Sequence, residues 1–237
     1  MRGDGTRRIT TIGFDADDTL WHNEVFFRLT QDRFAALLED YASPDHLAER
    51  LLEAERRNLG RYGFGIKGFV LSMIETAMDV TCDRVPASIL RRIIEAGKEM
   101  TEHPVDLLEG VEAAITELRG TARLILVTKG DLLDQERKLA QSGLGEFFDG
   151  VEIVSDKTPA VYERVFERHG EGASRGLMAG NSMKSDVRPM IDAGGYGVHV
   201  PHGTVWALEH ADPPQDRSRF HEIATLGDLP RVISAID

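Results

Sequence analysis

ITTIGFDADDT, residues 9–19, is an apolar run that ends in an acidic turn. Residues 9–14 are mostly apolar and rich in β-branched side chains, so they predict a buried strand. Asp15, Asp17 and Thr19 follow this strand directly. An acidic turn after a strand is often only structural, because Asp side chains bond to their own backbone. Whether this turn has a chemical role therefore depends on what the rest of the chain places beside it.

The second half of the chain alternates short apolar runs with segments of helical character. The apolar runs predict strands at residues 124–127, 151–154, 177–179, 196–200 and, as a possible edge strand, 223–226. Helices are predicted at residues 111–118, 132–141, 160–168, 187–193 and 229–236. This alternation predicts an α/β fold, a three-layer Rossmann-like core with a parallel sheet and right-handed crossovers.

Residues 23–102 have a different pattern. Their apolar residues recur at helical spacing, and Ser43-Pro44 and Pro86 are typical helix starts, because proline loses no hydrogen bond in the first turn. We expect about four helices and no strand here. The chain is therefore predicted to consist of an α/β core, residues 1–22 and 103–237, with an inserted all-helical cap at residues 23–102.

Composition narrows the class of protein. The 237 residues carry a formal charge of −12, which argues against nucleic-acid binding, because phosphate backbones favour clustered Lys and Arg. A small phosphorylated metabolite remains compatible, since a metal ion reverses the local field. Cys82 is the only cysteine, which excludes an internal disulfide and indicates a reducing cytoplasm. No run approaches the roughly 18 apolar residues of a membrane span. The oligomeric state stays open.

Polar residues are concentrated where the predicted strands end. In a parallel sheet, ligands bind beyond the carboxyl ends of the strands. The polar residues expected at that edge are Asp15, Asp17, Thr19, Thr128, Lys157, Asn181, Ser182, Ser185 and Asp186. Carboxylates that lie together repel one another unless a cation is present. Carboxylate oxygens without His or Cys suit a hard ion such as Mg²⁺.

These residues resemble the four motifs of the haloacid dehalogenase-like (HAD) hydrolase superfamily. Asp15-Ala16-Asp17-Asp18-Thr19 is similar to its first motif, DxDxT. Thr128 resembles the second motif, Lys157 the third, and the run from Gly180 to Asp186 the fourth. The helical insert lies where the family has a C1-type cap. The resemblance extends over essentially the whole chain, and the motifs occur in the right order at the right strand ends.

The resemblance implies a magnesium-dependent phosphohydrolase that acts on a small phosphomonoester. Asp15 would attack phosphorus and form an aspartyl-phosphate, and Asp17 would be the general acid and base. Thr128 would bind the phosphoryl oxygens, and Lys157 would neutralise their charge. Mg²⁺ would be held by Asp15, the backbone carbonyl of Asp17, and Asp186. Thr19 and Asn181 would also take part in binding the phosphate or substrate.

The fourth motif departs from the commonest family pattern at its first position. Asn181 stands where many relatives have Asp, and an Asn side chain carries no negative charge. We interpret Asn181 as an outer-shell or water-mediated contact and assign the direct metal bond to Asp186. This departure puts the strength of metal binding in question more than its existence.

Gly63-Phe64-Gly65-Ile66-Lys67-Gly68 matches the pattern GxGxxG. That pattern indicates a dinucleotide site only between a strand and a helix, and a charged helical stretch precedes it here. We interpret it as a turn between cap helices. Its neighbours Arg61, Tyr62 and Lys67 either reach over the active site and bind substrate or belong to a solvated connection.

Three other functions are compatible with the same fold. A 2-haloacid dehalogenase uses the same nucleophile without metal, but its second acidic position is usually not Asp, so Asp17 favours phosphoryl chemistry. A sugar phosphomutase would keep Asp17 but would have to shelter the aspartyl-phosphate from water. A non-catalytic protein built on this fold would use its acidic surface to bind partners.

Overall fold

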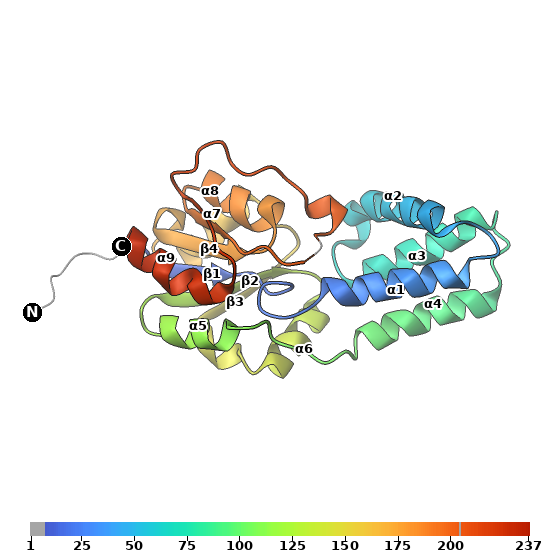
Figure 1. The fold of residues 1–237 in the computed structure, drawn as a ribbon, viewed down its shortest axis with the longest axis horizontal. Coiled ribbons are helices and arrows are strands. Elements are labelled where there is room, and N and C mark those ends of the chain that lie inside the picture. The colour runs from blue at the N-terminus through green and yellow to red at the C-terminus, as the bar shows by residue number, and fades with distance from the viewer. Residues whose placement is uncertain (1–7, 204) are drawn as a thin grey trace, which may run out of the picture. The chain divides into compact units, whose positions relative to one another are not determined.

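The computed structural model describes residues 8–203 and 205–237. Six strands form one sheet in the order β3-β2-β1-β4-β5-β6 (Figure 1). The strands are β1 Thr11–Phe14, β2 Arg123–Lys129, β3 Gly150–Val154, β4 Gly176–Gly180, β5 Tyr196–His199 and β6 Phe220–Glu222. β1 pairs in parallel with β2 and β4, as do β4 with β5 and β5 with β6. The predicted parallel α/β sheet is confirmed.

β1 lies at the centre of the sheet, where the strand order reverses. Thr11 pairs with Arg123 of β2 on one side and with Gly176 of β4 on the other. The backbone N–H of Asp15 donates to the carbonyl of Ala179 at 2.9 Å, so Asp15 follows the last paired residue of β1. Ligand sites of open α/β sheets lie beyond the strand ends at such a reversal. The residues after β1 and β4 are therefore neighbours at this edge.

Helices cover both faces of the sheet and give the three layers. The helices of this part of the chain are α5 Val111–Leu118, α6 Leu132–Ser142, α7 Pro159–His169, α8 Arg188–Asp192 and α9 Leu229–Ile236. Ile12 and Phe14 of β1 belong to the buried cluster that includes residues of α5 and α9. Met178 of β4 belongs to a second cluster, with α7 and α8. Alternate strand residues point to opposite faces, so the sheet is covered on both.

The helical segment has a hydrophobic core of its own. Its helices are α1 Glu24–Leu37, α2 Pro44–Tyr62, α3 Ile66–Val80 and α4 Ala87–Met100. Large buried side chains such as Phe34, Phe69 and Met73 form this core. Asn23–Pro104 and Lys129–Arg137 make up one compact unit. The described residues up to His22, with Val105–Thr128 and Lys138–Asp237, make up the other.

The helix starts and the glycine-rich turn of the helical unit follow local rules. Ser43 caps α2 by accepting from the backbone N–H of His46, with Pro44 in the first turn as predicted. Pro86 precedes α4 as its cap residue instead of lying inside the first turn. Gly63 and Gly65 have φ of +73° and +114°, and they end α2 and begin α3. The GxGxxG stretch is therefore a turn between helices. No helix among the described residues is long and apolar enough to cross a membrane.

Two segments differ from the sequence predictions. The edge strand is Phe220–Glu222, so the prediction of a strand at 223–226 is wrong. Ile223 and Leu226 are buried in the core of the sheet unit, and a short 3₁₀ turn, Leu226–Asp228, begins there. The backbone N–H of Ile223 still donates to the carbonyl of His199 in β5 at 3.0 Å, so the sheet contact ends there and does not extend to Leu226. The helix predicted at 187–193 is preceded by a π-helical turn, η3, at Met183–Val187.

Two glycines of the helical unit differ in the space around them, so replacing each with alanine tests how closely the helices pack. A Cβ at Gly97 of α4 would approach Cγ2 of Val70 in α3 at 2.3 Å, whereas one at Gly60 of α2 meets nothing within 4 Å. Alanine is favoured over glycine in a helix by about 1 kcal/mol. We expect Gly60→Ala to raise the free energy of unfolding by up to about 1 kcal/mol. Gly97→Ala should lower it by about 1–3 kcal/mol through overpacking. Urea unfolding measures both, and equal stabilisation would contradict the close approach of α3 and α4.

Candidate active site

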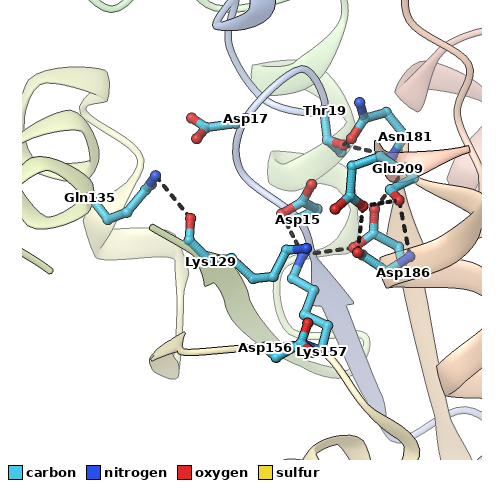
Figure 2. A network of polar contacts seen from close by, with 12 residues as sticks. Asp15, Asp17, Thr19, Lys129, Gln135, Asp156, Lys157, Asn181, Asp186 and Glu209 are labelled. Atoms are coloured by element: carbon cyan, nitrogen blue, oxygen red, sulfur yellow. Dashed lines mark hydrogen bonds and ion pairs between the residues drawn. The ribbon is translucent and has the colours of Figure 1, made fainter. Parts of the chain in front are cut away.

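Three buried charges meet at the carboxyl edge of the sheet. The Nζ of Lys157 donates to Oδ1 of Asp15 at 2.5 Å and to Oδ1 of Asp186 at 2.7 Å (Figure 2). Asp15 follows β1, Lys157 lies in the loop after β3, and Asp186 lies in η3 after β4. All three side chains are buried, and Asp186 has no exposed surface. The structure therefore brings together three of the residues that the sequence singled out.

The pKa values of this group reflect burial and mutual repulsion. Burial and the nearby charge of Asp186 raise the pKa of Asp15 to about 7, although Lys157 opposes the shift. Burial alone would lower the pKa of Lys157, but the charges of Asp15 and Asp186 outweigh it and hold that pKa above its ordinary value. One ammonium group shared by two carboxylates leaves an excess of negative charge, so a further cation would stabilise ionised Asp15.

Asp186 is held by the backbone of the fourth motif. Its Oδ2 accepts from the N–H of Ser182 at 2.9 Å. A Cβ at Gly180 would lie 2.2 Å from the same oxygen. Only glycine fits at this position, because the carboxylate occupies the space of a side chain. The end of β4 is therefore shaped around Asp186.

Thr19 and Asn181 connect the loop after β1 to the loop after β4. The N–H of Asn181 donates to Oγ1 of Thr19 at 3.0 Å, and that hydroxyl is 3.4 Å from Oδ1 of Asn181. His199 of β5 contacts the carbonyl of Asn181 at 3.1 Å through its Nε2. Between the two Asp residues of the first motif and Thr19, Asp18 adopts φ of +57°. The acidic turn is thus fixed at both ends.

Asp17 has its own partners beside this group. Its Oδ1 accepts from Nε1 of Trp21 at 2.8 Å and from Nζ of Lys138 at 3.0 Å. Figure 2 shows its carboxylate directed away from that of Asp15. Trp21 is buried, and this contact gives its ring nitrogen a polar partner. Lys138 lies on α6 and carries no motif, so the sequence did not point to it.

The remaining predicted residues lie at separate places. Thr128 is a buried residue of β2, and the β1–β2 register puts it level with the acidic turn, since Phe14 pairs with Leu126. Arg61, Tyr62 and Lys67 belong to the helical unit. In that unit the hydroxyl of Tyr62 donates to Glu75 at 3.2 Å, and Nζ of Lys67 lies 3.3 Å from Asp131. A part for these three in substrate binding stays a prediction.

Glu209 is a site residue that the sequence did not indicate. It lies in a short 3₁₀ turn, Ala207–Glu209, between β5 and β6. Its Oε2 accepts from Oγ of Ser182 at 2.6 Å and from the hydroxyl of Ser185. Figure 2 shows Glu209 in the same cluster as Asp15, Asn181 and Asp186. No motif marks this loop, and only the folded chain brings it to the fourth motif.

The donor groups at this edge fit a divalent cation. Asp15 and Asp186 converge on one point, because both contact the same ammonium group. No set of three His, Cys, Asp or Glu side chains in the described ranges is arranged to hold a metal ion by itself. An ion here would therefore take two carboxylates, with backbone oxygen and water completing its shell. Mg²⁺ typically binds in this way, through one or two carboxylates and several waters.

Comparisons with known proteins agree with this geometry. Residues 9–194 match the haloacid dehalogenase-like hydrolase family. N-acylneuraminate-9-phosphatase of Rattus norvegicus is 25% identical over 138 residues, which are 55% of this chain and 53% of that protein. The chain thus spans about half the length of that relative.

Two solved structures resemble the whole chain. A haloacid dehalogenase-like family hydrolase from Xanthomonas campestris is 39% identical, with a TM-score of 0.87 over 100% of this chain and 95% of that one. The putative HAD-hydrolase YfnB from Bacillus subtilis, bound to magnesium, is 20% identical, with a TM-score of 0.64 over 95% and 99% of the two chains. Since the family match extends from β1 past the fourth motif, the chain belongs to the haloacid dehalogenase-like hydrolase family.

Proposed function

We propose that this protein is a magnesium-dependent phosphohydrolase that cleaves a small phosphomonoester through an aspartyl-phosphate on Asp15. The observation that carries the proposal is the contact of Lys157 with both Asp15 and Asp186 at the carboxyl edge of the sheet. A similar protein is a phosphatase by name, and a protein of the same fold binds magnesium. The second carboxylate of the first motif, Asp17, favours phosphoryl transfer over dehalogenation.

The residues would divide the reaction into two displacements. A carboxylate oxygen of Asp15 attacks phosphorus, and the bond from phosphorus to the leaving oxygen breaks. Asp17 would give a proton to that oxygen from its carboxylic acid form, in which it no longer makes the ion pair with Lys138. Water then attacks the aspartyl-phosphate and gives a proton to Asp17, which releases phosphate and restores both groups.

The other residues would stabilise charge during both steps. Lys157 neutralises the equatorial oxygens of phosphorus, and Thr128 donates a hydrogen bond to one of them. Asp15, the carbonyl of Asp17, and Asp186 would hold Mg²⁺, whose charge would reduce the repulsion between the attacking carboxylate and the phosphate. Thr19 and Asn181 hold the two loops that carry these groups.

We also propose that the helical segment, residues 23–102, acts as a cap on the core formed by residues 1–22 and 103–237. A cap that closes over the substrate excludes bulk water and completes the site. The turn with Arg61, Tyr62 and Lys67 would then be the part of the cap that contacts substrate. A cytoplasmic location fits the single cysteine.

Removal of the metal tests the reaction class. The purified protein should release phosphate from p-nitrophenyl phosphate and from members of a panel of phosphorylated metabolites in the presence of Mg²⁺. Excess EDTA should abolish the release, and added Mg²⁺ should restore it. Activity that is unaffected by EDTA, or fluoride release from fluoroacetate, would favour a metal-free dehalogenase instead. Turnover of a sugar phosphate without phosphate release would favour a phosphomutase.

Asp15→Asn should remove the nucleophile and leave the fold intact. The amide oxygen is a poor nucleophile, so we expect phosphate release to fall by more than about 1000-fold. Acid-quenched protein should carry phosphate in the wild type but not in the variant. Unfolding by urea serves as the control for the fold. Substantial remaining turnover would show that Asp15 is not the nucleophile.

Asp17→Asn should separate the two displacements. With an alkyl phosphate, loss of the general acid should slow turnover by about 100- to 10,000-fold. p-Nitrophenolate leaves without a proton at neutral pH, so this substrate should still give a burst of one product per enzyme, followed by a stalled phosphoenzyme. Stopped-flow absorbance measures the burst. If steady turnover of p-nitrophenyl phosphate continued at the wild-type rate, Asp17 would not be the base.

A further inference from the structure

Glu209 brings a carboxylate to the fourth motif from a distant part of the chain. Its Oε2 accepts from the hydroxyls of Ser182, at 2.6 Å, and Ser185, the two serines of that motif. Hydroxyl donors stabilise an ionised carboxylate and leave its negative charge in place. Asn181, directly before Ser182, has a neutral side chain whose amide oxygen faces the hydroxyl of Thr19. Of these two residues, only Glu209 therefore adds negative charge beside the fourth motif.

The turn that carries Glu209 is fixed to η3 by additional contacts. The Nζ of Lys184 donates to the carbonyl of Leu208 at 2.6 Å. The N–H of Ser185 donates to Oγ of Ser182 at 2.9 Å, which orients the hydroxyl that Glu209 accepts. The side chain of Glu209 is only partly exposed. These contacts hold its carboxylate in a defined place beside Asp186.

A further contact links Glu209 to the buried part of the site. Tyr162 donates its hydroxyl to the carbonyl of Ser185 at 2.9 Å. Burial raises the pKa of Tyr162, and the charges of Asp186, Asp15 and Glu209 raise it further. Ser185 thus contacts Tyr162 through its carbonyl and Glu209 through its hydroxyl. The ammonium of Lys157 contacts Asp15 and Asp186.

We propose that Glu209 supplies negative charge to the cation site in place of the neutral Asn181, so that the affinity for a divalent cation depends on Glu209. No third side chain is arranged as a direct ligand among the described residues, so Glu209 acts through its field and through waters on the ion. Mg²⁺ keeps several waters in protein sites, which makes such an outer contact effective. The inference rests on the proposed function only for the presence of a cation.

A purely structural role makes a different prediction. If Glu209 served only to fasten the turn to η3, a glutamine would still accept from both serine hydroxyls through its amide oxygen. Glu209→Gln would then leave cation affinity unchanged. The substitution removes charge and keeps the shape, so it separates the two roles.

The test is cation binding by the full chain without substrate. Titration with Mn²⁺, followed by electron paramagnetic resonance of the free ion, gives the dissociation constant. Competition with Mg²⁺ gives the constant for that ion. We expect Glu209→Gln to weaken binding by about 10- to 100-fold, the usual effect of losing an outer-shell partner. Glu146→Gln is the matched control, because it removes the same charge from an exposed side chain, and it should leave binding unchanged.

A second carboxylate in the motif should rescue the loss. The double variant Asn181→Asp with Glu209→Gln should recover most of the affinity, because it returns the charge next to Asp186. If Glu209→Gln does not fold, as judged by its thermal unfolding, Asn181→Asp alone carries the test and should bind Mn²⁺ more tightly than the wild type. Unchanged affinity in Glu209→Gln, or no gain from Asn181→Asp, would overturn the proposal.

The outcomes separate this inference from the proposed function. A wild type that binds Mn²⁺ through Glu209 but hydrolyses no phosphoester would support the inference and refute the phosphohydrolase. If the wild type hydrolyses phosphoesters with Mg²⁺ but Glu209→Gln leaves cation affinity unchanged, the phosphohydrolase is supported and the inference is refuted. A wild type that binds no divalent cation would overturn both.

Discussion

The site depends on one constraint, the sharing of a single ammonium group by two buried carboxylates. Asp15 and Asp186 are far apart in the sequence, and each would carry an unpaired charge in the interior without Lys157. Removing one member of a buried ion pair costs several kcal/mol, because the other charge is left uncompensated. The arrangement is nevertheless incomplete, since one positive charge faces two negative ones. The excess of negative charge is what a further cation would neutralise.

Much of the fold, and the part of the site formed by Asp15, Lys157 and Asp186, could be predicted from the sequence, because both depend on where the strands end. A parallel sheet brings the carboxyl ends of its strands to one edge, so the order of apolar runs was enough to predict that Asp15, Lys157 and Asp186 would meet. Helix starts such as Ser43-Pro44 were readable because their chemistry is local. The bounds of α5 and α9 were predictable for the same reason, since amphipathic spacing marks both.

The remaining features depend on contacts that no local pattern specifies. Glu209 reaches the fourth motif only because its loop folds back after β5, and Lys138 reaches Asp17 from a helix with no motif. The edge strand was misplaced for a related reason. Ile223 is apolar because it packs in the core, and β6 ends just before it, where the chain turns toward α9. Apolar character alone does not distinguish these two causes.

The central position of β1 makes its pairing depend on residues that lie far along the chain. Thr11 of β1 pairs with Arg123 and with Gly176. Both partners are synthesised long after β1. Such distant pairings require the closure of long loops, which slows folding. The helical unit has its own core and mostly sequential helix contacts, with α3 next to α2 and α4. The two parts of the chain therefore differ in contact order, and Asp15 reaches its backbone partner Ala179 only through a pairing that spans most of the chain.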